Sequence, residues 1–370
     1  MFIRSLYLHH FRNYEEAYFE FNPKLNLFCG ANAQGKTNVL EALHYCITGR
    51  SFRTCRSAEL IQDGAPAFFL EIKYTKHEVE QSLRISFDGT ERKITHNSTL
   101  LPSPSSLAGI IPVVTTCPDD VNLVKGSPIL RRRFLDLQIS QTDPLYVHHL
   151  TRYTRALKQR NRLLKAKQLM SIESWEHEMS RSAAYITRQR YRTAEELQVH
   201  CARVHNELIR DPEQLMISYH SGINSALTVE EMRNCYLDRF RANRSRELYL
   251  GHTLSGPHKD DLHFAIDNKD ARFFASEGQQ RSYMTTVHLA EWHRLSQAGD
   301  EKPVMMLDDV GISLDNMRCS RLLDRLADLG QVFLTSTNEN LLENLSVSNR
   351  LFYIRKGLQT SKNNPCAINC

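Results

Sequence analysis

Short apolar runs in the first third of the chain predict β-strands. They lie at residues 2–8, 25–29, 67–73 and 83–87. Runs of this length, bounded by turn residues, are typical of strands. After Thr37 the apolar residues recur at the spacing of one helix face. These residues are Val39, Leu40, Leu43 and Ile47. The strand at 25–29 is therefore expected to lead through a short loop into an amphipathic helix.

Between about residue 120 and residue 245 the apolar period becomes helical throughout. The first run contains Leu150, Tyr153, Leu157 and Leu164, and the second contains Trp175, Met179, Ile186 and Leu197. A break near Ser171 separates the two runs. Two helices with one apolar stripe each are expected to pack as an antiparallel hairpin. Each is expected to be too short for an extended coiled-coil arm.

The last third returns to alternating strands and helices. Residues 304–307 are a continuous apolar run that ends in Asp308 and Asp309, as expected for a strand buried on both faces. Further elements are predicted at 318–329 (a helix), 331–336 and 351–355 (strands). The pattern predicts an α/β head interrupted by an inserted α-helical domain. The predicted bounds are 1–118 for the first part of the head, 119–245 for the helical domain, 246–360 for the second part of the head and 361–370 for a loose tail.

Composition and charge narrow the class of protein. The 370 residues are 41% hydrophobic and 24% charged, with a net charge of +5, as in a soluble globular protein. No apolar stretch is long enough to span a membrane, and residues 1–16 are too often interrupted by basic side chains for a secretory signal. The nine cysteines form no CxxC pair, which favours reduced thiols and a cytoplasmic location.

Positive charge is concentrated between residues 131 and 167, where ten Lys or Arg stand against two acids and the segment carries +8. Basic side chains on one helix face can bind a DNA backbone without reading its sequence. The candidates are Arg131, Arg132, Arg133, Arg152, Arg155, Lys158, Arg160, Arg162 and Lys165. The alternatives are a solvated outer helix face and, for 131–133, internal salt bridges.

The loop after the strand at 25–29 satisfies the pattern GxxxxGK[ST]. It consists of Gly30, Ala31, Asn32, Ala33, Gln34, Gly35, Lys36 and Thr37. The glycines let backbone N–H groups point at phosphate oxygens, and the following helix adds the positive end of its dipole. Lys36 is expected to neutralise the β- and γ-phosphates of ATP, and the Thr37 hydroxyl to bind Mg²⁺. The flanking strand and helix disfavour the alternative, a chance glycine-rich turn.

A P-loop ATPase also needs a carboxylate at the end of a neighbouring strand. Asp308 is expected to hold the metal, and Asp309 to orient or deprotonate the attacking water. A pair of solvated acids is the alternative. Asp308 lies 272 positions after Lys36, whereas nucleoside kinases and small GTPases keep these residues much closer, and no NKxD motif is present. A large insertion must separate the two motifs.

Residues 276–281, Ser-Glu-Gly-Gln-Gln-Arg, resemble the signature motif of ABC-type ATPases. In that class the motif covers the γ-phosphate bound by a second subunit, so that two heads enclose two ATP molecules. Ser276, Gly278 and Gln279 are therefore expected to act on the nucleotide of a partner copy. A helix N-cap by Ser276 is the alternative explanation.

Together these motifs resemble the RecF family, bacterial recombination mediators with an ABC/SMC-like head, over most of the chain. The resemblance rests on residues 11–14 (FRNY), 30–38 (GANAQGKTN), 123–128 (LVKGSP), 131–136 (RRRFLD), 157–161 (LKQRN), 255–261 (SGPHKDD), 276–281 (SEGQQR) and the Asp308–Asp309 pair. It places Arg12, Asn13 and Asn38 near the bound nucleotide.

The chain departs from the family pattern at two places. Lys259 stands where the family usually has Arg, which replaces a forked donor by a point charge. Residues 310–315 replace a pattern ending in Ser-Glu-Leu-Asp, so the expected D-loop lacks a carboxylate at Ser313 but keeps Asp315. Communication between two sites is expected to be weaker. The switch role after the strand at 331–336 is assigned to Thr337 or Ser336.

The resemblance implies an ATP-dependent homodimer that clamps double-stranded DNA near single-strand gaps and junctions. Slow, DNA-dependent ATP hydrolysis would then release the DNA. It also implies RecR and RecO as partners and, indirectly, the loading of RecA. Two alternatives remain open: a scaffold that holds ATP but hardly hydrolyses it, and a different SMC-like head without a DNA partner. The length of the chain excludes a long-armed SMC protein.

Overall fold

The computed structural model describes residues 1–208, 213–309, 323, 325–326, 328–342 and 348–360. Its contacts divide the chain into two compact units. The first consists of Met1–Asp120 and Met284–Cys370, and the second of Val121–Tyr283. None of the described helices combines the length and the apolar composition that a membrane crossing requires.

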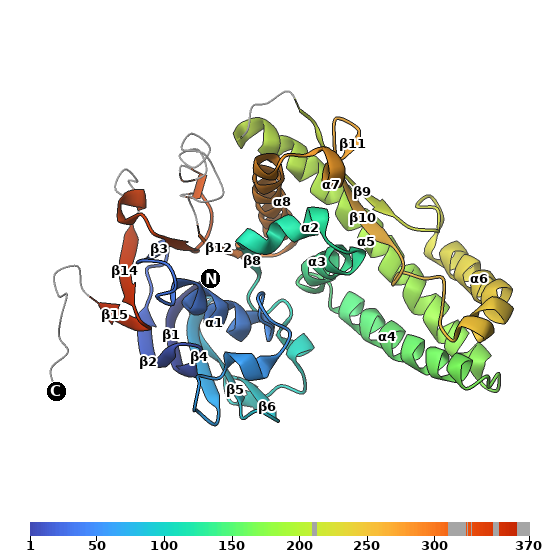
Figure 1. The fold of residues 1–370 in the computed structure, drawn as a ribbon, viewed down its shortest axis with the longest axis horizontal. Helices are drawn as coiled ribbons and strands as arrows, with labels where there is room; N and C mark the ends of the chain where they lie inside the picture. The colour runs from blue at the N-terminus through green and yellow to red at the C-terminus, as the bar shows by residue number, and fades with distance from the viewer. Residues whose placement is uncertain (209–212, 310–322, 324, 327, 343–347, 361–370) are drawn as a thin grey trace. The chain divides into compact units, whose positions relative to one another are not determined.

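The first unit contains a six-stranded sheet in the order β15-β14-β3-β13-β12-β8 (Figure 1). Its strands are β3 (Leu25–Cys29), β8 (Val113–Thr116), β12 (Val304–Leu307), β13 (Val332–Ser336), β14 (Asn349–Arg355) and β15 (Leu358–Thr360). All neighbours are parallel except the β14–β15 hairpin. β3, β12 and β13 are buried along their whole length, which accounts for the continuous apolar sequence of β12 and the largely apolar sequences of β3 and β13.

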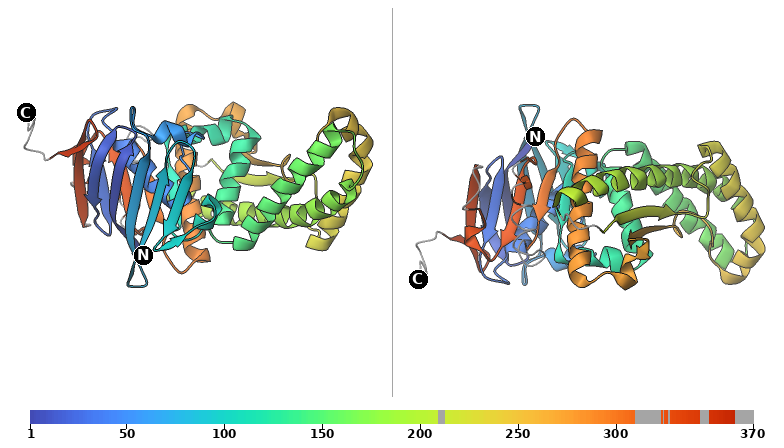
Figure 2. Two further views of the ribbon diagram at one scale, coloured as in Figure 1. Left: turned by 90° about the horizontal axis from the view of Figure 1, so that it is seen from below. Right: turned by 90° about the horizontal axis from the view of Figure 1, so that it is seen from above.

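A second sheet of the same unit is antiparallel, in the order β2-β1-β4-β5-β6-β7. The left view of Figure 2 shows its blue to cyan strands side by side. Its strands are β1 (Phe2–Phe11), β2 (Tyr14–Glu20), β4 (Phe68–Lys76), β5 (Val79–Phe87), β6 (Arg92–His96) and β7 (Thr99–Leu100). One hydrophobic core joins this sheet, the parallel sheet and helix α1 (Lys36–Thr48). Aromatic rings link the two sheets: Phe21 of the chain after β2 lies edge-on to Phe333 of β13, with 4.9 Å between ring centroids.

Short 3₁₀ helices connect the strands of the first unit. They are η1 (Ser57–Leu60), η2 (Pro104–Leu107), η3 (Pro118–Asp120) and η4 (Glu339–Leu342). Helix α8 (Glu277–Ala298) begins in the second unit and continues into the first, where it leads to β12. The chain thus leaves the first unit after β8 and returns through α8 to β12, the strand next to β8 in the sheet.

The second unit is mainly helical. Its helices are α2 (Val121–Lys125), α3 (Pro128–Ser140), α4 (Pro144–Lys165), α5 (Ile172–Leu208), α6 (Val229–Leu250) and α7 (Ala271–Phe274). α4 and α5 pack against each other as predicted, and α5 also packs against α6 and β9. Caps fix the ends of α4 and α6: Asp143 accepts from the Tyr146 N–H, and Thr228 forms a capping box with Glu231.

The second unit also contains a three-stranded antiparallel sheet that the sequence pattern did not predict. Its order is β11-β10-β9, formed by β9 (Leu215–His220), β10 (Asp261–Ile266) and β11 (Lys269–Asp270). Because β10 pairs with β9, residues 246–283 belong to the second unit. This corrects the predicted return to the head at residue 246, whereas the first division, after Asp120, lies two residues from the predicted 118.

Arg160 is a fully buried cation in the second unit. Its guanidinium contacts Glu176 Oε1 at 2.8 Å and Glu247 Oε2 at 2.7 Å, and it donates to Thr253 Oγ1 at 2.9 Å. All three charged side chains are inaccessible to solvent. A buried charge is tolerated when it is paired and fully hydrogen-bonded. Arg160 therefore ties α4 to α5 and α6, and it is corrected from a DNA candidate to an internal ion-pair residue.

Replacing Arg160 by Leu should destabilise the protein by about 3–5 kcal/mol, because Glu247 is left as a buried carboxylate without its counter-charge. The matched control is Arg162→Leu, two positions along the same helix at an exposed site, which should change stability by at most about 0.5 kcal/mol. The measurement is urea unfolding followed by circular dichroism. Equal midpoints for the two variants would show that the buried ion pair does not stabilise the fold.

His288 of α8 lies between two acids in the first unit. Its Nε2 is 2.9 Å from Asp120 Oδ2 and its Nδ1 is 3.1 Å from Glu291 Oε2. Burial alone would lower the pKa of His288, but Asp120 and Glu291 outweigh burial and raise it to about 10. The two carboxylates therefore favour the charged form of the ring.

We expect the His288 cluster to make stability depend on pH. The pKa of His288 rises from its ordinary 6.5 to about 10 on folding, so its contribution is complete below pH 6.5 and is lost as pH rises through about 10. The measurement is the difference in free energy of unfolding between the unmodified protein and His288→Gln from pH 6 to pH 10. This difference should shrink with rising pH, while the same difference for His252→Gln, at an exposed position, should stay near zero. A constant difference for His288→Gln would contradict the assignment.

Candidate nucleotide site

The P-loop, residues 30–37, joins the buried strand β3 to helix α1 as the sequence predicted. Gly35 has φ 113° and precedes the first turn of α1, a conformation that favours glycine. The ammonium group of Lys36 donates to the carbonyl oxygens of Gly30 at 2.8 Å and Ala31 at 2.9 Å. Burial lowers the pKa of Lys36, and the nearby Asp309 and Asp308 oppose that shift. The cation is thus folded back on its own loop.

Asp308 lies beside the P-loop at the end of β12. Its Oδ1 accepts from the Thr37 hydroxyl at 2.8 Å and from the Thr335 hydroxyl at 2.7 Å. Burial raises the pKa of Asp308, while these two hydrogen bonds act in the opposite direction. Asp309 has a left-handed backbone, with φ 61°, and its N–H donates to Thr335 Oγ1 at 2.7 Å. A non-glycine residue in that region is uncommon and is held here by its neighbours.

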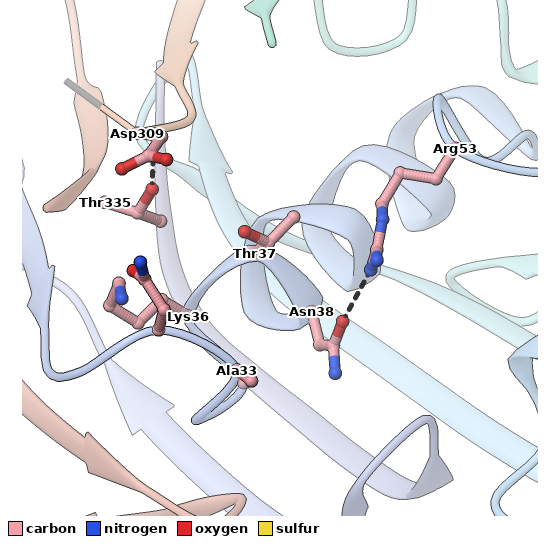
Figure 3. A pocket seen from close by; sticks show the side chains of 9 residues that line it. Ala33, Lys36, Thr37, Asn38, Arg53, Asp309 and Thr335 are labelled. Atoms are coloured by element: carbon pink, nitrogen blue, oxygen red, sulfur yellow. Dashed lines mark hydrogen bonds between the residues drawn. The ribbon is translucent and has the colours of Figure 1, made fainter. Parts of the chain in front are cut away.

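A cavity of about 410 Å³ lies beside the P-loop (Figure 3). It is lined by Asn32, Ala33, Gly35, Lys36, Thr37, Asn38, Arg53, Asp309 and Thr335. Seven of these nine were predicted from the sequence. The cavity therefore places two cations, two hydroxyls and a carboxylate around one space, beside the N-terminus of α1. That combination suits a polyphosphate.

The donor atoms next to the cavity fit a hard divalent cation. The Thr37 hydroxyl and the Asp308 carboxylate are 2.8 Å apart, and both offer oxygen. Mg²⁺ prefers oxygen ligands and keeps some of its coordination for water and phosphate oxygens. Thr37 and Asp308 are thus the residues that would hold Mg²⁺ here.

Arg12 and Asn13, which the resemblance placed near the nucleotide, contact α1 and the P-loop but do not themselves line the cavity. Arg12 contacts the buried Glu41 of α1 with two hydrogen bonds of 2.8 and 2.9 Å, so its guanidinium is engaged within the fold and does not line the cavity. Asn13 donates to the Gln34 carbonyl at 3.1 Å and accepts from the Asn38 amide at 2.7 Å. Asn13 therefore supports the P-loop from outside the cavity.

Two cavity residues were not predicted. Arg53 donates to Asn38 Oδ1 at 2.8 Å and is half-exposed (Figure 3); its sequence position, in a loop after α1, carried no recognisable pattern. Thr335 lies in the strand predicted at 331–336, but only the strand order places its hydroxyl beside Asp308. The residue of this strand that contacts Asp308 is thus Thr335. The residues predicted for the switch role, Ser336 or Thr337, lie one and two positions later.

Comparison with known proteins identifies the family. A family model described as an AAA domain matches residues 5–200. A protein of Protochlamydia amoebophila (strain UWE25), DNA replication and repair protein RecF, is 53% identical over 353 residues, which cover 95% of this chain and 98% of that protein. The chain belongs to the RecF family. The predicted family is thereby confirmed.

Solved structures agree with this family and with its fold. The recombination mediator protein RecF with ATP, from the RecFOR pathway, has a TM-score of 0.90 and 28% identity, covering 97% of this chain and 98% of that one. An SMC head bound to the C-winged helix domain of ScpA shares the fold, with a TM-score of 0.56 and 15% identity over 97% and 96% of the two chains. The predicted α/β ABC/SMC-like ATPase head is confirmed.

The signature residues lie in the second unit, at the start of α8. Ser276 and Gln279 cap each other, with Ser276 N–H to Gln279 Oε1 at 2.8 Å and Gln279 N–H to Ser276 Oγ at 3.2 Å. Ser276 and Gly278 are exposed, and no described atom comes within 4 Å of the position of a Cβ on Gly278. The capping explanation therefore holds, and it leaves this surface accessible. Asp315 and the expected D-loop lie outside the described residues.

The basic segment separates into internal and exposed residues. Arg131 is buried and makes a bidentate pair with Asp261, at 2.7 and 2.8 Å, so it is corrected from a DNA candidate to an internal ion pair. Arg132 donates to the Asp260 carbonyl at 2.7 Å, and Arg152 pairs with Glu178. Arg133 is half-buried. The exposed candidates that stay predictions are Arg152, Arg155, Lys158, Arg162 and Lys165.

We expect Thr335→Val to lower the rate of ATP hydrolysis by about 10–100-fold, the usual effect of losing a partner that orients a metal ligand. Valine keeps the shape of threonine but removes the hydroxyl that binds both Asp308 and the Asp309 N–H. Thr335→Ser keeps the hydroxyl and should retain most of the rate. The measurement is steady-state phosphate release as a function of Mg²⁺ concentration. Equal rates for the two variants would show that the hydroxyl plays no part.

Proposed function

We propose that this chain is an ATP-dependent recombination mediator that binds ATP with Mg²⁺ at the P-loop and hydrolyses it slowly. The observation that carries the proposal is the Thr37–Asp308–Thr335 cluster beside Lys36, because it brings a P-loop, a metal-ligating carboxylate and a cavity of about 410 Å³ together. Family membership supports it, since a relative with 28% identity has been solved with ATP.

Each residue of the site has one task in this proposal. Lys36 exchanges its bonds to the Gly30 and Ala31 carbonyls for the β- and γ-phosphates. Thr37 and Asp308 would hold Mg²⁺, which when bound would neutralise charge on the phosphates. Asp309, on the cavity wall, orients the attacking water and accepts its proton. Most of the rate then comes from fixed charges and not from covalent catalysis.

A second copy of the chain completes the site in this proposal. Ser276, Gly278 and Gln279 belong to the unit that does not contain the P-loop, and the surface at Ser276 and Gly278 is exposed. In ABC-type heads such a surface covers the γ-phosphate held by the partner subunit. ATP binding would therefore bring two copies together, and hydrolysis would release them.

The proposed target is double-stranded DNA near single-strand gaps and junctions. The exposed cations on α4 supply a sequence-independent surface for phosphates, whose binding should weaken as salt rises. The solved relatives are described as parts of the RecFOR pathway. RecR and RecO are therefore the proposed protein partners, with RecA loading as the indirect result.

The test measures ATP hydrolysis against protein concentration, with and without duplex DNA. We expect the rate per subunit to rise with protein concentration and with DNA, because the complete site needs two copies. Ser276→Arg should abolish this rise while ATP still binds, since the large cation fills the space intended for the partner's phosphate. Ser98→Arg, which adds the same charge at an exposed turn of the first unit, is the matched control and should behave like the unmodified protein.

Two outcomes would replace this mechanism. A rate that is independent of concentration and of DNA would exclude a composite site. ATP binding without measurable hydrolysis, together with DNA binding that still depends on ATP, would favour the scaffold alternative.

A further inference from the structure

The P-loop is packed between two hairpin turns that come from opposite ends of the sequence. One is the β1–β2 turn, which carries Asn13, and the other is the β14–β15 turn, which carries Lys356 and Gly357. Both turns and the P-loop belong to the first unit. Neither the ATP-binding pattern nor the metal-ligating carboxylate involves the second turn.

Gln34 of the P-loop accepts hydrogen bonds from both turns. Its carbonyl accepts from the Gly357 N–H at 2.9 Å and from the Asn13 amide at 3.1 Å. Its side-chain Oε1 accepts from the Lys356 N–H at 2.9 Å. Gln34 stands between Ala33 and Gly35, which both line the cavity. A shift of the β14–β15 turn would therefore move Gln34 and its two neighbours in the wall of the cavity.

Glycines allow the close approach at each point of this packing. A Cβ on Gly357, whose φ is +75°, would lie 2.2 Å from the Asn13 carbonyl oxygen. A Cβ on Gly30 would lie 2.4 Å from the Ile354 carbonyl oxygen of β14, and one on Gly35 would lie 2.7 Å from the Asn13 side chain. Backbone oxygens cannot rotate away as a flexible side chain can. A side chain at Gly357 would force the two turns apart.

We propose that the β14–β15 turn is a positioning element of the nucleotide site and that Gly357 is its positioning residue. The turn holds Gln34, and with it the P-loop, in the shape that receives the phosphates before any nucleotide arrives. A loop fixed in its bound conformation loses less entropy on binding, so the affinity for ATP is higher. This inference rests on the proposed function, because it concerns the same phosphate site.

The alternative is that the turn only completes the edge of the parallel sheet. β14 pairs along its length with β3, so damage to the hairpin could destabilise the unit without a special effect on ATP. The two explanations differ in what they change. A positioning role affects binding of ATP at a temperature where the protein is folded, whereas an edge role affects only the melting temperature.

The experiment compares Gly357→Ala with Gly89→Ala in the full-length chain. Gly89 is the matched control: its φ is +89°, so alanine suffers the same backbone strain, but no described atom lies within 4 Å of its Cβ position. The measurements are the Kd of a fluorescent ATP analogue with Mg²⁺, KM and kcat for hydrolysis, and the melting temperature. We expect Gly357→Ala to raise Kd and KM at least about tenfold with little change in kcat, because uniform binding is lost while the chemistry is intact.

A second variant tests the same turn without a steric clash. Gln34→Ala removes the acceptor for the Lys356 N–H and should also raise Kd, by a smaller factor than Gly357→Ala and at an unchanged melting temperature. If Gly357→Ala fails to fold, this variant decides alone. Unchanged Kd in Gln34→Ala, or equal Kd in Gly357→Ala and Gly89→Ala, overturns the positioning role. Failure of the unmodified protein to bind the analogue overturns the proposed function instead.

Discussion

Asp308 accepts hydrogen bonds from the hydroxyls of Thr37 and Thr335, and these two contacts join three segments that are far apart in the sequence. They form because β3, β13 and β12 are parallel neighbours in that order, so their carboxyl ends meet at one edge of the sheet. A buried carboxylate needs hydrogen-bond partners there. The arrangement of the P-loop, the Asp308 carboxylate and the cavity depends on this strand order.

The same strand order accommodates a very large insertion. The chain leaves the sheet at the end of β8 and re-enters it at β12, and these two strands are adjacent and parallel. Parallel neighbours always need a crossover connection. Residues 121–283 form an independent compact unit within that crossover, and α8 returns the chain to β12. The second unit can thus be as large as it is without disturbing any strand pair of the site.

Ion pairs inside the second unit hold several of its motif residues in place. Arg131 binds Asp261, Arg160 binds Glu176 and Glu247, and Arg190 binds Asp136 and the Pro257 carbonyl. The motifs RRRFLD and SGPHKDD are therefore joined in the interior of the second unit, whereas LKQRN is joined through Arg160 to α5 and α6. Charges removed from water must be paired. Arg131 and Arg160 of the basic segment 131–167 are therefore paired in the interior. The exposed cations of α4 are the part of that segment that solvent can reach.

The sequence by itself determined the P-loop, its flanking strand and helix, the buried strand ending in Asp308, and the hairpin of α4 and α5. Each of these depends on local periodicity or on a short motif, which neighbouring residues carry. Only the tertiary structure decided the contacts of Thr335, Arg53 and Gly357 with the site, the pairing of β9 with β10, and the internal role of Arg131 and Arg160. Those depend on strand order and on packing between segments up to about 320 residues apart, and a single sequence contains no local signal for either.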